Sequence, residues 1–150
     1  MRRREFITFV AGAAAAWPLG TRAQQATKVP QIGVLSLGHG DKSDASLTTL
    51  DAFMPALREL GYTEGQNIAF ERKFADGDAN KLSRLAQELV DRRVDAIVAF
   101  ATPAARAAKQ ATSAIPIIAI AMADPVEDGL VSTLARPGGN VTGTTFLGPD

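Results

Sequence analysis

Short apolar runs alternate with helical patterns along most of the chain. Residues 31–37, 96–100 and 115–121 are apolar on both faces of an extended strand, which is typical of central strands covered by helices on both sides. Residues 67–72 alternate in polarity and carry Glu71 and Arg72, so they suit an edge strand. Strands that alternate with helices predict an α/β domain with a parallel sheet.

Two helices are predicted between these strands. Leucines recur at helical spacing over residues 81–92, with Asp78 or Asn80 as the cap. A second apolar stripe covers residues 47–60 and ends at Gly61, a suitable left-handed C-terminal cap. Pro55 interrupts this stripe and removes one backbone hydrogen bond, so we expect a kink there.

The carboxyl edge of the sheet is where an open α/β fold binds ligands, and the sequence repeats one device at this edge. Thr102-Pro103 follows the third strand and Asp124-Pro125 follows the fourth, each a capping residue before a proline that suits the first helical turn. Two helix N-termini side by side would favour an anion, such as a carboxylate or phosphate. The alternative is that both pairs simply start helices.

The N-terminal 23 residues form an export signal. Arginines at positions 2–4 precede an apolar stretch over residues 8–19 that is too short to span a bilayer, and small residues at 21 and 23 suit a cut after Ala23. Paired arginines followed by an apolar pair are typical of the twin-arginine type. The mature chain is then predicted to be residues 24–150, located in the periplasm.

The amino-acid composition limits the classes of partner that the chain is expected to bind. The chain has no cysteine, so neither a disulfide nor a lipid anchor on a cysteine near the cut is expected. Four of the 16 basic residues but only one of the 16 acidic ones lie before the predicted cut, so the mature chain is slightly acidic. Basic residues are scattered, which argues against a nucleic-acid partner. We expect a small-molecule or protein partner.

The loop after the first strand carries His39, the only histidine, between Gly38 and Gly40. Ser43 stands where a dinucleotide fingerprint would need its third glycine, and neither a P-loop nor a Gly-x-Ser-x-Gly elbow occurs. A histidine-rich metal site is excluded. His39 is therefore a ligand-facing or solvated loop residue, or the acid/base of an enzyme.

An ordered set of short motifs carries a family resemblance. They are GYTEGQN at 61–67, DGD at 76–78, ATPAA at 101–105, IPI at 115–117, DPV at 124–126 and RPGGNVTG at 136–143. In this order and spacing, the chain resembles the ABC transporter substrate-binding protein family that includes the tryptophan-binding TrpX-like proteins. The similarity runs from residue 32 to residue 145.

The resemblance implies a type I periplasmic-binding-protein fold, in which two α/β lobes close on a solute and deliver it to a membrane permease. Family members are about twice as long, so residues 24–150 would be the N-terminal lobe with the second lobe absent, as in a fragment or a truncated gene product. No cofactor, metal or bond chemistry is implied.

Carried over by position, the family's ligand contacts fall on six residues. Thr102 and the N–H groups of Ala104 and Ala105 would hold a ligand carboxylate, Asp124 would offset an ammonium group, and Ser36 and His39 would lie beside them.

Three questions stay open from the sequence. The tryptophan-binding relatives suggest that the solute is an aromatic amino acid. Another small carboxylate stays open, because the mature chain has no tryptophan to stack on an aromatic solute once Trp17 is removed with the signal. The competing function is an exported α/β enzyme that uses the same sheet edge, with His39 as acid or base and Asp124 as its partner. A third possibility is a remnant that binds nothing.

Overall fold

The structure is a computed structural model that describes residues 28–146. Its elements are β1 (Gln31–Ser36), α2 (Ala45–Glu59), β2 (Ala69–Phe74), α3 (Ala79–Asp91), β3 (Ala96–Phe100), α4 (Ala101–Ala111), β4 (Ile117–Met122) and β5 (Val141–Thr145). The predicted signal at residues 1–23 lies outside the described residues. No helix within residues 28–146 has both the length and the apolar character needed to cross a bilayer.

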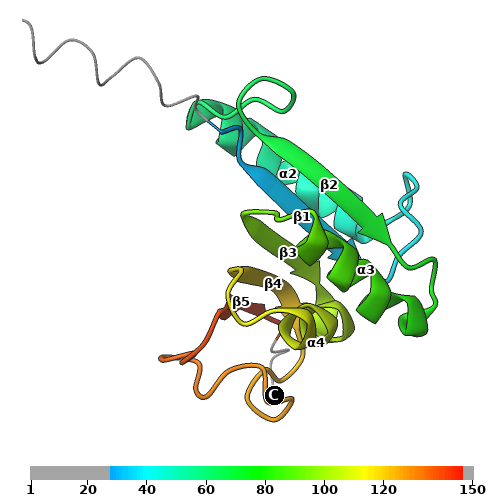
Figure 1. Cartoon of the computed structure of the whole chain (residues 1–150), viewed down its shortest axis with the longest axis vertical. Coiled ribbons are helices and arrows are strands. Elements are labelled where there is room, and N and C mark those ends of the chain that lie inside the picture. Colours follow the sequence, from blue (N-terminus) through cyan, green and yellow to red (C-terminus); the bar gives the residue numbers. More distant parts are fainter. Residues whose placement is uncertain (1–27, 147–150) are drawn as a thin grey trace, which may run out of the picture.

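The five strands form one parallel sheet in the order β2-β1-β3-β4-β5 (Figure 1). This order confirms the predicted α/β fold class, the central positions of the first, third and fourth strands and the edge position of β2. The edge strand β5 was not predicted. Its sequence VTGTT buries only Val141, so it lacks the apolar run that marks the central strands.

Two strands begin two residues later than predicted, each for a local reason. Asn67 closes the turn before β2, since its side chain accepts from Thr63 N at 2.7 Å and donates to Gly61 O at 2.7 Å. Before β4 stands Pro116, which lacks the N–H group that a strand residue donates. Side-chain and proline chemistry thus set where pairing starts.

One face of the sheet is covered by α3 and α4 (Figure 1). Leu82, Leu85 and Leu89 of α3 are buried in the main core, and α4 buries alanines, which let its backbone lie close to β3 and β4. The N-cap of α3 is Asp78, as predicted, whose side chain accepts from Asn80 N. This face holds most of the buried apolar side chains.

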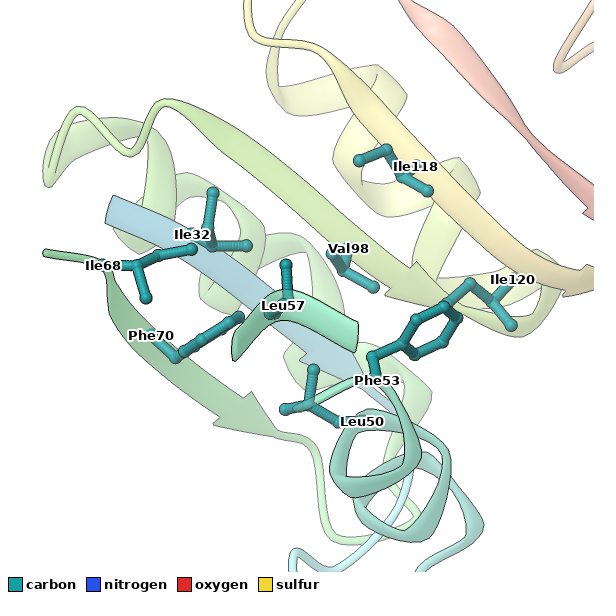
Figure 2. A pocket seen from close by; sticks show the side chains of 9 residues that line it. All are labelled: Ile32, Leu50, Phe53, Leu57, Ile68, Phe70, Val98, Ile118 and Ile120. Carbon is teal, nitrogen blue, oxygen red and sulfur yellow. The ribbon is translucent and has the colours of Figure 1, made fainter. Parts of the chain in front are cut away.

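The other face is covered by α2, and less completely. Leu50, Phe53 and Leu57 of α2 face apolar side chains of the sheet across a pocket of about 240 Å³ (Figure 2). Phe53 is 50% exposed and Ile118 of β4 is 40% exposed, although both are large apolar residues. One helix therefore leaves part of this apolar face open, whereas parallel sheets are normally covered on both faces.

The helix α2 is continuous through Pro55 and ends before Gly61, which adopts the predicted left-handed conformation with φ of +87°. The kink at Pro55 stays a prediction.

Core position decides how much a leucine contributes to stability. We expect Leu89→Ala, which removes a fully buried side chain from beneath α3, to lower the free energy of unfolding by about 2–5 kcal/mol. Leu60→Ala is the matched control, because Leu60 is 74% exposed, and its effect should stay within about 0.5 kcal/mol. Urea unfolding followed by circular dichroism measures both variants. Equal losses in the free energy of unfolding would contradict the placement of Leu89 in the buried core.

Candidate functional site

The carboxyl ends of β1, β3 and β4 lie at one edge of the sheet because these strands are parallel neighbours. A pocket of about 260 Å³ opens there, between the strand ends and the first turns of α2. Its lining is mostly apolar, with three hydroxyls and one carboxylate, and consists of Ser36, Leu37, Gly38, Asp44, Ala45, Ser46, Thr49, Phe100, Ala101, Ile120 and Ala121. An apolar pocket with a few polar groups is typical of small-molecule sites.

Two alanines in this lining adopt a backbone conformation that side chains disfavour. Ala101 has φ of +65° and Ala121 has φ of +58°, although neither is glycine. The left-handed region costs an L-residue about 1–2 kcal/mol, and such residues cluster at ligand sites. Ala121 also lies where the pairing register of β4 and β5 shifts, so the strand end is re-aimed at the pocket.

The helix α4 begins earlier than the sequence predicted. Its N-cap is Phe100, whose side chain forms no capping bond, and not Thr102. The left-handed Ala101 turns the chain directly from β3 into the helix, so Pro103 is the third helical residue instead of the first. The N–H groups of Ala101 and Thr102 consequently precede the first intrahelical bond.

Three predicted site residues lie in this helix. Thr102 does not line the pocket, because its Oγ1 accepts from Ala123 N at 3.1 Å and joins α4 to the segment after β4. Ala104 and Ala105 are fully buried, and both follow Pro103 within the helix. Their N–H groups donate within the helix. Any N–H group of α4 without an intrahelical partner therefore lies before Ala104, in the first turn of the helix.

The second predicted helix start, at Asp124-Pro125, is wrong. The carboxylate of Asp124 accepts from Val126 N at 3.0 Å and Glu127 N at 2.9 Å, as a cap would, but only a turn follows. Gly129 has φ of +66° and ends the turn. Only one of the two predicted helix N-termini therefore exists at this edge.

The remaining predicted residues, Ser36 and His39, follow β1. Ser36 is only 4% exposed and lines the pocket, and its Oγ accepts from Gly38 N at 3.1 Å. His39 is exposed and lies next to the turn at Gly77. Neither His39 nor Asp124 lines the pocket, so the geometry gives no support to an acid/base pair there.

Sequence reasoning missed Asp44, which supplies the only carboxylate in the lining. Asp44 is the N-cap of α2, and its side chain accepts from Gly40 N and Ser46 N, both at 2.9 Å. Burial would raise the pKa of Asp44, but the hydrogen bonds from Ser46, Gly40 and His39 outweigh burial and hold the pKa below its ordinary value. The capping position before the apolar stripe of α2 was the signal that could have identified this residue.

The apolar pocket beneath α2 is a different kind of space. It is lined by nine apolar residues and exposes no polar surface (Figure 2). A charged or zwitterionic solute finds no partner there, because charged groups need compensating polar contacts once they leave water. The pocket at the carboxyl edge is therefore the candidate ligand site. Within residues 28–146, no group of three histidine, cysteine or acidic residues is arranged to hold a metal ion.

Comparisons with known proteins identify the family of the chain. Residues 32–146 match the family model described as ABC transporter substrate binding protein. A tyrosine-binding protein of Clostridioides difficile (strain R20291) is 45% identical over 93 residues, which make up 62% of this chain and 27% of that protein.

Solved structures show the same fold. An ABC domain from Streptococcus pneumonia in complex with L-Trp is 35% identical with a TM-score of 0.68, over 77% of this chain and 38% of that one. The ligand-free, open structure of a substrate binding protein with adhesive properties from Clostridium difficile is 37% identical with a TM-score of 0.71, over 78% and 39%. The chain thus spans about two fifths of the length of these solved relatives.

Relief of the backbone strain at the pocket should be measurable. We expect Ala101→Gly to raise the free energy of unfolding by about 0.5–1 kcal/mol, since glycine adopts positive φ without a steric penalty. Ala105→Gly, in the same helix but with a buried helical alanine, should lower it by about 1 kcal/mol or more. Chemical denaturation compares the two variants, and equal destabilisation would show that Ala101 is not strained.

Proposed function

The chain belongs to the ABC transporter substrate-binding protein family, and on this premise we propose that it is part of an extracytoplasmic receptor that captures an amino acid and delivers it to a membrane permease. The observation that carries the proposal is the pocket at the carboxyl edge of β1, β3 and β4, with the start of α4 beside it. Two relatives bind tyrosine and L-Trp, which are amino acids with aromatic side chains, and this supports the proposed solute class.

The proposed binding mode assigns each part of the solute to a part of the pocket. The carboxylate lies at the start of α4, where the N–H group of Thr102 and the helix dipole favour an anion. The apolar side chain packs against Phe100 and Ile120 in the lining. Ser36 adds a hydroxyl at the end of β1 to the same lining.

The described lobe supplies one wall of the proposed site. The solved relatives are longer than this chain, and we propose that residues 24–150 form one lobe of a two-lobe clamp. Closure of a second lobe over the pocket supplies the opposite wall and excludes water from the solute. The open form recorded for one relative fits a protein that closes on its ligand.

The proposed location follows from the family and from the N-terminal sequence. Receptors that feed an ABC permease work outside the cytoplasm, and residues 1–23 have the features of a removable twin-arginine signal. Export is the part of the proposal that fractionation of the natural host addresses directly.

Two neighbouring threonines on α2 test the position of the site. Thr49 lines the pocket, whereas Thr48 is exposed outside it. We expect the protein at its natural length to bind L-tryptophan or L-tyrosine saturably in calorimetric titrations, and Thr49→Phe to weaken binding at least about tenfold by filling the pocket. Thr48→Phe is the matched control and should leave the affinity unchanged.

Two results would count against the proposal. If no amino acid in a panel of the common twenty binds to the folded protein, the proposed solute class is wrong. If Thr49→Phe binds as tightly as the unchanged protein, the solute binds elsewhere.

A further inference from the structure

We propose that Asp44 receives the ammonium group of the solute and thereby selects an α-amino acid over the same acid without its amino group. The inference rests on the proposed function and deepens it. It replaces the sequence-based assignment of this role to Asp124, which does not line the pocket, whereas Asp44 does.

The position of Asp44 is fixed by its surroundings. Its two oxygens accept from opposite sides, Oδ2 from Gly40 N and Oδ1 from Ser46 N. Gly38 packs so closely that an added Cβ would collide with this carboxylate, so the loop after β1 lies directly against it. A charged group held in place in this way is ready to bind a ligand without a cost in side-chain entropy.

The charge of Asp44 is available to a ligand. None of the ion pairs formed among residues 28–146 includes Asp44, and the pocket lining contains no lysine or arginine. The neutral donors around the carboxylate stabilise its charged form but do not cancel the charge. A cationic group entering the pocket would therefore meet an ionised carboxylate without a competing counter-ion.

The pocket lining contains the starts of two helices, and these differ in polarity. Asp44 lies at the start of α2 in the same lining as Ala101, which is the first residue of α4. The uncapped start of α4 favours an anion, whereas the acidic cap gives the start of α2 a negative charge. This pattern matches an α-amino acid, which carries one ammonium and one carboxylate on the same carbon. A plain carboxylic acid would use only the α4 side.

The alternative is that Asp44 only caps α2, as Asp78 caps α3. Asparagine caps a helix about as well as aspartate but carries no charge. Its single amide oxygen can keep the bond from Ser46 N but not the bond from Gly40 N as well, so binding of a ligand without an amino group is needed to separate the two roles. Asp78→Asn is the matched control, since Asp78 makes the same type of bond, to Asn80 N, and does not line the pocket. If Asp44→Asn fails to fold, Asp44→Ser provides a second neutral cap.

The experiment compares two ligands by calorimetric titration at pH 7 with the protein at its natural length. The ligands are L-tryptophan and 3-(indol-3-yl)propanoate, which lacks the amino group, with L-tyrosine and its deaminated analogue as a second pair. We expect Asp44→Asn to weaken binding of the amino acid by at least about tenfold through loss of a charge-assisted contact. Binding of the deaminated acid should change by less than about twofold.

Each other outcome overturns the inference in a recognisable way. If the unchanged protein binds the amino acid and Asp44→Asn binds it equally well, Asp44 is only a cap, while the proposed function stands. If Asp44→Asn weakens both ligands equally, or if Asp78→Asn has the same effect, the loss reflects damage to the fold. If the unchanged protein binds neither amino acid, the proposed function fails and the inference fails with it.

Discussion

Parallel pairing of β1, β3 and β4 is the constraint on which the candidate site depends. It brings the ends of three strands, which are far apart in the sequence, to one edge of the sheet. The chain then has to leave that edge, and it does so through the start of α2, the start of α4 and a turn after β4. Unpaired backbone groups and capping side chains gather there as a result, which is why open α/β sheets bind ligands at this edge.

Strained residues at this edge lower the stability of the fold, and the buried core offsets that loss. Ala101 and Ala121 adopt left-handed backbone conformations beside the pocket. Leu35, Leu89 and Ile97 are fully buried in the main core, on the face of the sheet that α3 and α4 cover. A well-packed core can hold a few strained residues in place, and those residues aim the strand ends at the pocket. The face beneath α2 is less complete, with Ile118 partly exposed, and it contributes apolar surface instead of polar contacts.

The fold could be predicted largely from the sequence, whereas the site could be predicted only in part. Apolar runs identify central strands because burial on both faces demands them, and the charged residues of β2 mark an edge. The exact helix starts could not be predicted, because a left-handed Ala101 is a consequence of tertiary packing and leaves no signature in an alanine. The turn after Asp124 fails to become a helix because Gly129 ends it within one turn, although the capping spacing is correct.

The central claim is that a zwitterionic solute binds across the carboxyl edge, between α2 and α4. The most direct measurement is a crystal structure of the protein at its natural length with L-tryptophan bound. The account predicts a carboxylate oxygen at about 3 Å from the N–H group of Thr102, with the indole ring against Phe100. An amino acid bound in the apolar pocket beneath α2, or away from the start of α4, would contradict it.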